Sequence, residues 1–435
     1  MMTLTEMPKY DTYKNSGVEW IGDIPAHWNI KKLKYTSNIN NQTLPENTPG
    51  DFLFDYVDIG SVTLENGIEK VETFLFSDAP SRARRLAKQG DTVVSTVRTY
   101  LKAISYVDKK SSEYIYSTGF AVINPKDENS SKYLTHFIKS DAFTNQVDDV
   151  AKGISYPAIN SSELSNLLVV EPSTPEKNAI ADFLDEKTAK IDDAIAIKEQ
   201  QIALLNERKQ ILIQQAVTQG LDPSAPMKNS GVAWIGKIPE HWQVKRLKFV
   251  LDERSERSLT GEEPLFMVSQ QYGLVVRADY HEKAVVAASN IDSKVVYKND
   301  LVFNKLKAHL GVFFKSNMDF KGLVSPDYAV YKIKDYISDT KILELLFRNP
   351  LYIEQFTIRA TGVVEGLIRL YTSDLFDISI PIAPKEEQLE ILSHIEKMSV
   401  FFDKAIEIHR DQCEKLKEYK TTLINSAVTG KIKVV

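Results

Sequence analysis

Hydrophobic and polar positions follow two patterns along the chain, in the order globular, helical, globular, helical. In the globular stretches, short runs rich in β-branched and aromatic residues are bounded by Gly, Asp, Asn and Pro, which is typical of strands. These runs are residues 91–97, 120–123, 295–303 and 329–333. Between them, Lys132 to Val147 and Thr340 to Arg359 are each predicted to form a single helix. Each globular half is therefore predicted to mix helices and strands.

The two late stretches each carry one apolar seam whose spacing alternates between four and three residues, as in a long coiled-coil helix. The seam positions are Ile191, Ile195, Lys198, Ile202, Leu205, Lys209, Leu212 and Ala216 in the first stretch, and Phe402, Ile406, His409, Cys413, Leu416, Lys420, Leu423 and Ala427 in the second. Prolines precede both stretches and Gly220 and Gly430 follow them, so both helices have defined stops. Each seam is the expected partner of the other.

The chain is internally duplicated. The segment from Lys14 to Trp28 returns almost verbatim from Lys228 to Trp242, and from Ser162 to Thr218 the first copy matches the second without a gap. We therefore predict an α+β protein with two similar mixed α/β domains and two long helices. The predicted boundaries are 1–171 for the first domain, 172–220 for the first helix, 221–383 for the second domain and 384–435 for the second helix.

Connectivity predicts how the helices pair. The second domain begins after the first helix and finishes just before the second helix, and compact domains tend to have neighbouring termini. The end of the first helix should then lie beside the start of the second, so the helices run antiparallel and a pseudo-two-fold axis relates the copies. About 40 residues per helix, at 1.5 Å each, would give a rod of roughly 60 Å.

Composition narrows the class of protein. With 435 residues, 43% of them hydrophobic and 26% charged, the chain is an ordinary globular protein of about three units. The net charge of −5 excludes global basicity, so any nucleic-acid binding must come from local patches. A single cysteine, Cys413, excludes a disulfide framework and fits a reducing cytoplasm. No signal-like or membrane-spanning apolar run is present, so we expect a cytoplasmic protein without membrane partners.

The sequence offers little catalytic chemistry. Asn349-Pro350-Leu351-Tyr352 faintly resembles a loop that holds flipped bases in amino-methyltransferases, but the repeat places Ser140 to Phe143 there, inside a predicted helix. No Gly-rich cofactor loop follows a strand, and no cluster of His, Cys or carboxylate residues has metal-ligand spacing. We therefore expect a non-catalytic chain with no cofactor or metal of its own. His27 and His241, each beside a tryptophan, are interpreted as packing residues, and Cys413 as a small core residue of the seam.

Candidate DNA contacts are side chains that reach phosphates or base edges. In the first half, a basic cluster precedes Gly90, and a second group after the next strand takes alternate positions, so it should share one face. In the second half, one group surrounds Gly273 in a predicted hairpin. The candidates are Arg82, Arg84, Arg85, Lys88, Arg98, Tyr100, Lys102, Lys152 and Tyr156 in the first half, and Gln270, Gln271, Tyr272, Arg277, Asn304, Lys305, Lys307, His309, Arg359, Arg369 and Tyr371 in the second. The alternative for each is a solvated surface side chain.

Several stretches together resemble a known family. The paired G-V-x-W-I-G-x-I-P-x-H-W openings, the Gly90 to Arg98 stretch, the Val268 to Gly273 stretch and the Glu386-Glu387-Gln388 start of the second helix are similar to the specificity subunit of type I restriction-modification enzymes. The resemblance covers nearly the whole chain. One departure is Glu176-Lys177-Asn178 at the first helix, where the family usually has Glu-Gln.

The resemblance implies a function and partners. Each globular half would be a target recognition domain that reads one half of a bipartite, asymmetric double-stranded DNA target. The helices would set the spacer and dock modification subunits, which carry S-adenosylmethionine for DNA methylation, and restriction subunits, which use ATP and Mg, would join that core.

Two other readings of the residues remain open. A self-contained modification enzyme would need a cofactor loop, which methyl-donor binding by the chain alone would reveal. A non-catalytic tandem-domain coiled-coil scaffold for protein interaction would show no salt-dependent DNA binding.

Overall fold

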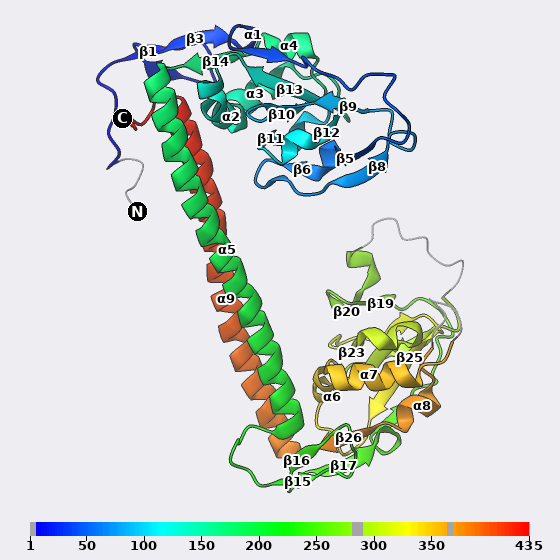
Figure 1. Cartoon of the computed structure of the whole chain (residues 1–435). Helices are drawn as coiled ribbons and strands as arrows, with labels where there is room; N and C mark the ends of the chain where they lie inside the picture. Colours follow the sequence, from blue (N-terminus) through cyan, green and yellow to red (C-terminus); the bar gives the residue numbers. More distant parts are fainter. Residues whose placement is uncertain (1–5, 281–289, 363–368, 435) are drawn as a thin grey trace. The chain divides into compact units, whose positions relative to one another are not determined.

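The computed structural model describes residues 6–280, 290–362 and 369–434, and the chain divides into two compact units. Unit 1 combines Met1–Glu199 with Arg410–Val435, and unit 2 is Gln200–His409. Each unit contains a globular part, called head 1 (residues 6–171) or head 2 (residues 221–383), and segments of the long helices α5 (Thr174–Gln219) and α9 (Lys385–Val428) (Figure 1).

The centre of head 1 is an antiparallel sheet in the order β11-β10-β13-β4. The central strand β10 (Thr92–Ser95) is buried along its whole length, as expected for a strand covered on both faces. A second sheet, β8-β5-β12-β9, contains one parallel pair, β5 with β12. The other bounds in head 1 are β1 (Tyr13–Asn15), β2 (Asp23–Pro25), β3 (Asn29–Lys32), α1 (Leu33–Thr36), β4 (Ser37–Ile39), β5 (Leu53–Val57), β6 (Val62–Thr63), β7 (Gly67–Ile68), β8 (Glu72–Leu75), β9 (Ala83–Leu86), β11 (Ile104–Tyr106), β12 (Ile115–Ser117), β13 (Phe120–Pro125), α2 (Ser131–Lys139), α3 (Asp141–Val150), α4 (Ser161–Ser165) and β14 (Leu168–Glu171).

Head 2 has the same central sheet, β23-β22-β25-β18, again antiparallel throughout. It differs beyond that sheet, because the hairpin β19-β20 and the pair β21-β24 stand where head 1 has its second sheet. The bounds in head 2 are β15 (Met227–Asn229), β16 (Lys237–Pro239), β17 (Gln243–Arg246), β18 (Leu251–Glu253), β19 (Phe266–Ser269), β20 (Gly273–Val276), β21 (Lys294–Val296), β22 (Leu301–Asn304), β23 (Phe313–Lys315), β24 (Gly322–Val324), β25 (Tyr328–Ile333), α6 (Lys341–Leu346), α7 (Pro350–Arg359), α8 (Thr372–Phe376) and β26 (Ser379–Ile382).

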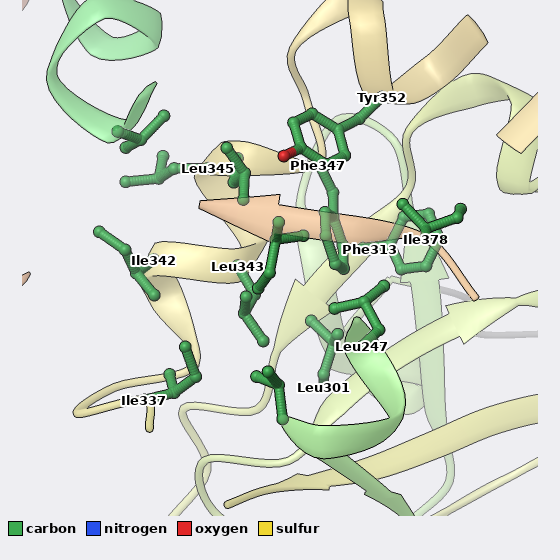
Figure 2. Packing of buried hydrophobic residues seen from close by; sticks show 14 of the residues in the cluster. Leu247, Leu301, Phe313, Ile337, Ile342, Leu343, Leu345, Phe347, Tyr352 and Ile378 are labelled. Atoms are coloured by element: carbon green, nitrogen blue, oxygen red, sulfur yellow. The ribbon is translucent and has the colours of Figure 1, made fainter. Parts of the chain in front are cut away.

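Helices pack on the central sheet through aromatic side chains. In head 2, Phe313 of β23 lies against Phe347, which follows α6, with ring centroids 5.0 Å apart (Figure 2). Leu301 of β22 and Leu343 of α6 belong to the same buried cluster. In head 1, Phe137 of α2 packs against Phe143 of α3, with ring centroids 6.2 Å apart. Each head therefore has its own core and its own rigid frame.

Two predicted single helices are wrong, because each is two helices with a sharp break. Ser140 is extended between α2 and α3, where its hydroxyl donates to the carbonyl of Phe137 at 2.6 Å. Asn349 is extended between α6 and α7, its side-chain oxygen accepts from the Leu351 amide at 2.9 Å, and Pro350 opens α7. In head 1 the Ser140 hydroxyl satisfies a carbonyl at the end of α2 without capping α3, whereas in head 2 the Asn349 side chain caps the start of α7.

The predicted strand run 295–303 is also two elements. Its first part, β21, pairs with β24, whereas its last part, β22, joins the central sheet. Between them the Asp300 carboxylate accepts from the Tyr297 amide at 2.8 Å, and Asn299 has a φ of 67°. The turn chemistry of Asn and Asp overrides the uninterrupted β-propensity of the run.

The helix seam is confirmed in both units. All sixteen predicted seam side chains are buried or half-buried, Cys413 among them. Lys420 of α9 pairs with Asp192 of α5 at 2.7 Å in unit 1, and Lys209 of α5 pairs with Asp403 of α9 at 2.7 Å in unit 2. Higher numbers on α5 face lower numbers on α9, so the predicted antiparallel pairing is also confirmed. The helices have 46 and 44 residues, slightly more than the expected 40.

Candidate nucleic-acid interface

In head 1, two of the predicted groups lie on one surface. A short 3₁₀ helix (Thr99–Leu101) follows β10, and the Ile159 amide of the loop before α4 donates to the Thr96 carbonyl at 2.9 Å. The guanidinium of Arg98 lies over the ring of Tyr156, 5.2 Å from its centroid. Arg98, Tyr100 and Lys102 therefore stand beside Lys152 and Tyr156.

The sequence predicted that this group shares one face because it alternates along a strand, and that reason is wrong. Arg98, Tyr100 and Lys102 do not alternate along an extended strand, because they occupy the 3₁₀ turn. Arg98 and Lys102 both have left-handed backbone, with φ of 52° and 44°. Positive φ is uncommon for residues other than glycine, and it marks a turn whose shape is imposed by its surroundings.

The basic cluster around β9 divides between different environments. The carbonyl of Arg82 accepts from the Thr118 amide, near the end of β10 that leads into the 3₁₀ turn. Lys88 precedes the other end of β10. Arg84 lies over the ring of Phe76 and donates to the carbonyl of Ala83, so it is already engaged within the head. Burial lowers the pKa of Arg85, whose Nε has no hydrogen-bond partner among the described residues.

In head 2, the equivalent surface is built in the same way. A 3₁₀ segment (Lys305–Leu310) follows β22, and the Leu370 amide donates to the Lys305 carbonyl at 3.0 Å, which brings Arg369 and Tyr371 beside it. The loop before α8 thus corresponds to the loop before α4. The two loops also begin with the same A-x-G pattern, Ala151-Lys152-Gly153 in head 1 and Ala360-Thr361-Gly362 in head 2.

Several head 2 candidates are held by neighbours. Arg369 pairs with Asp327 at 2.7 Å, and Lys305 with Glu253 at 3.4 Å. Arg359 donates to the side chain of Gln355 at 2.6 Å, and Asn304 accepts from the Leu306 amide at 3.0 Å. The exposed candidates of this surface are Lys307 and Tyr371, and His309 is half-buried.

The predicted hairpin around Gly273 is confirmed as β19-β20. Gln270, Gln271 and Tyr272 are exposed at its turn, and Arg277 follows it, half-buried. Tyr272 lies against Tyr280, with ring centroids 4.7 Å apart. The candidate residues of both heads stay predicted contacts, and the structure identifies which of them are free to reach a ligand.

The repeated tryptophan motif joins each head to the long helices. In unit 1, Nε1 of buried Trp28 donates to Glu176 of α5 at 3.0 Å, and His27 Nε2 lies 2.8 Å from the same carboxylate oxygen. Gly430, just after α9, packs so closely that an added Cβ would lie 2.9 Å from Trp28. The tryptophan therefore sits between the start of one long helix and the end of the other.

Unit 2 contains the same joint. Trp242 donates to Glu387 at 3.0 Å, His241 lies 2.7 Å from that carboxylate, and Gly220 packs on Trp242. Both histidines are satisfied, as predicted, but their side chains remain 56% and 49% exposed, so they are not enclosed packing residues. Sequence reasoning missed the two glutamates as their partners, although the glutamates recur with the motif.

Two further predictions about the chain can be compared with the structure. Asn349 caps α7, so the Asn-Pro-Leu-Tyr stretch has the structural role expected of it. At the start of the long helices, Gln388 makes four hydrogen bonds in unit 2, whereas Lys177 pairs with Glu171 in unit 1. Among the described residues, no three potential metal ligands converge, and no helix is both long and apolar enough to cross a membrane.

Comparison with known proteins agrees with this architecture. Residues 25–207 match the family described as type I restriction modification DNA specificity domain. The putative type I restriction enzyme MjaX specificity subunit of Methanocaldococcus jannaschii is 23% identical and is covered, like this chain, over 100% of its length. The family model, the curated relatives and the solved structures all support a type I restriction-modification specificity subunit. Members of this family are DNA-recognition subunits and not the catalytic subunits of their enzymes.

Other specificity subunits extend the comparison. The EcoKI specificity subunit of Escherichia coli K12 is 21% identical over 65% of this chain and 61% of its own length. The HsdS subunit of Thermoanaerobacter tengcongensis has the same fold, with a TM-score of 0.50, 21% identity, and coverage of 94% of this chain and 98% of that one. A chain from a study of complex assembly and conformational transition of a type I restriction-modification system matches with a TM-score of 0.67 and 21% identity, over 93% of this chain and 98% of that one.

Proposed function

We propose that head 1 and head 2 each read one half of a bipartite, asymmetric double-stranded DNA target. The observation that carries this proposal is one surface built twice: a 3₁₀ segment after the central strand, bonded to the loop before a short helix. The frame recurs while the side chains on it differ, such as Arg98 and Tyr100 in one head and Lys307 and His309 in the other. Two similar frames with different side chains suit two different half-sites.

Two measurements test the reading of DNA. Binding of the full-length chain to a mixed-sequence duplex should weaken steeply with salt, because phosphate contacts release counterions. Methylation mapping in cells that carry the chain with its modification subunits should then give one two-part motif. A flat salt dependence together with an absence of new methylation would overturn the proposal and favour a protein scaffold.

We further propose that α5 and α9 set the spacer between the half-sites. Inserting seven residues into each helix, after Glu199 and after His409, keeps the seam in phase and adds roughly 10 Å. At 3.4 Å per base pair, the methylated motif should gain about 3 base pairs of spacer and keep both half-sites. An unchanged spacer with an assembled, active complex would refute the role of the helices.

Unit 2 exposes a stripe of apolar side chains on its segments of the two long helices. Leu204 and Ile211 of α5, and Phe401 and Ile408 of α9, are exposed apolar residues that lie seven apart on each helix, outside the seam. The Lys209 to Asp403 pair places Ile211 at the level of Phe401, so the residues flank one face of the antiparallel pair. We infer that modification subunits, with S-adenosylmethionine, bury this stripe, and that restriction subunits with ATP and Mg join the assembly.

The stripe can be tested with a matched control. Phe401→Ser with Ile408→Ser should abolish copurification of the modification subunit and leave helix content unchanged, because these side chains are exposed. Val400→Ser removes an equally exposed apolar residue one position away from the stripe and should have no effect. Equal losses from both variants would refute the stripe as the docking face.

A further inference from the structure

The loop between α3 and α4 of head 1 exposes an apolar tip. Ile154 is fully exposed, with a relative accessibility of 104%, and Tyr156 is 66% exposed. Single exposed apolar residues are ordinary, but here they adjoin others. Val97 forms a bridge with Ala158, and Tyr100 and Leu101 of the neighbouring 3₁₀ turn are exposed as well. The tip and the 3₁₀ turn therefore expose apolar side chains on adjoining segments, which together are called the apolar patch.

The loop holds a defined shape. Lys152 and Ala158 exchange backbone hydrogen bonds of 2.9 and 3.0 Å across its neck. Gly153 has a φ of 109°, and a Cβ there would lie 3.0 Å from the carbonyl oxygen of Tyr156. Arg98 lies over the Tyr156 ring on one side. A closed neck, a required glycine and a stacked arginine fix where Ile154 is presented.

Three basic side chains, Arg98, Lys102 and Lys152, lie on the segments around the tip. Among the described residues, the Arg98 guanidinium contacts only the Tyr156 ring, so it is free to bind an anion. Lys152 pairs with Glu163 and Lys102 with Asp141, but the Lys152 side chain is 81% exposed and can exchange partners. An apolar tip beside basic side chains is suited to binding nucleic acid. Proteins that deform duplex DNA insert apolar side chains between base steps and hold the phosphates with cations.

We propose that Ile154 is a wedge that enters the DNA duplex between two base pairs of the half-site read by head 1, while Arg98 and Lys152 hold the flanking phosphates. This inference rests on the proposed function and deepens it. It adds a specificity mechanism that the polar candidates do not supply, because a step that unstacks easily is favoured at a position without any base contact.

The experiment uses the full-length chain and the duplex identified by methylation mapping, with 2-aminopurine replacing each adenine of the head 1 half-site in turn. Wild-type protein should raise the fluorescence at one step, where stacking is lost. Ile154→Ser should abolish that rise and weaken binding roughly 10- to 50-fold, by the loss of a buried isoleucine. Ile154→Leu should retain the rise. Leu53→Ser, which changes an exposed leucine on β5 of the same head, is the control.

The outcomes separate this inference from the proposed function. Sequence-specific binding with no fluorescence rise at any position, and equal affinity for Ile154→Ser and wild type, would overturn the wedge and leave the reading of DNA intact. Loss of subunit assembly without loss of DNA binding in Ile154→Ser would make the patch a protein contact and also overturn it. Failure of the wild-type chain to bind the mapped duplex would overturn both proposals.

Discussion

The buried ion pair of Lys177 and Glu171 stands at positions that the second copy fills with different side chains. Exchanging these side chains tests what the ion pair contributes to stability. Lys177 opens α5, Glu171 ends β14, and their side chains are 11% and 12% exposed. In unit 2 the same positions are Gln388, hydrogen-bonded to Ser338, Tyr336 and Ala383, and apolar Ile382. Unit 1 therefore uses a charged pair where unit 2 uses an amide and an alkyl group.

Breaking the pair should cost much more than replacing it. Glu171→Ile leaves a buried ammonium without its carboxylate, which typically costs 3–5 kcal/mol. Burial lowers the pKa of Lys177, but the charge of Asp127 opposes that shift, and Ser130 still accepts from Nζ of Lys177 at 3.1 Å. Because these two partners remain, we expect a loss of about 3 kcal/mol, the lower end of that range. Adding Lys177→Gln installs the solution of unit 2 and should restore stability to within about 1 kcal/mol of wild type.

Hydrogen exchange of peptides from β3 and β14 gives the local free energy of opening without assuming that the whole chain unfolds in one step. Burial already lowers the pKa of Lys177, and removal of the Glu171 carboxylate lowers it further, so the variant gains more stability than the wild type as pH rises and the defect of Glu171→Ile should shrink. Equal protection in the single and double variants would mean that the two residues are not coupled, and would refute the reasoning.

Other predictions follow from the joints, the heads and the capping residue. Burial raises the pKa of Glu176, but hydrogen bonds from Trp28, Ser173 and His27 together outweigh it and lower that pKa to about 2. Glu176→Gln should therefore lower the free energy of unfolding by ~1–2 kcal/mol at pH 5–8, after allowance for solvent screening. The difference from wild type in thermal melts should fade as pH drops from about 4.5 towards 2, because the carboxylate becomes protonated. Binding can be measured on duplexes altered in one half-site at a time. Gln270→Ala or Arg277→Ala should reduce discrimination at only one half-site, by roughly 1–3 kcal/mol, and Arg98→Ala should act on the other half-site or weaken binding uniformly. Loss of discrimination at both half-sites from one variant would show that the heads are not independent. Asn349→Ala should destabilise α7 by about 1 kcal/mol in urea unfolding and leave methylation by the assembled complex unchanged. Loss of methylation in the folded variant would instead indicate a catalytic role for the Asn-Pro-Leu-Tyr stretch.

The duplication made much of the fold predictable. A seam that returns in phase in both copies predicted the helices, and the order of domains and helices predicted their antiparallel pairing. Local breaks were harder to predict. Ser140 ends α2 inside a sequence with strong helical periodicity, because its side chain and an extended backbone decide the break, and neither changes the hydrophobic pattern.

The candidate interface was predictable in part, for a different physical reason. Residue type and position placed Arg98 and Lys307 after equivalent strands, which the fold confirms. The direction of a side chain depends on contacts made elsewhere in the fold. The sequence could not show that Arg84 contacts Phe76, while Nε of Arg85 has no hydrogen-bond partner in the described part of the chain. Nor could it select Ile154, whose significance lies in its exposure.

The similarity between the copies therefore points to structure more than to recognition. The segment that repeats almost verbatim forms the two joints, where Trp28 and Trp242 must each fit a carboxylate at the start of one long helix and a glycine at the end of the other. Three elements constrain each tryptophan at once, so few substitutions preserve the joint. The surfaces proposed to face DNA share a backbone frame but hardly a side chain, as the proposal of two different half-sites requires. In a duplicated reader, the positions where the copies differ on a shared frame are the places to look for specificity, and the loops before α4 and α8 are the clearest of them.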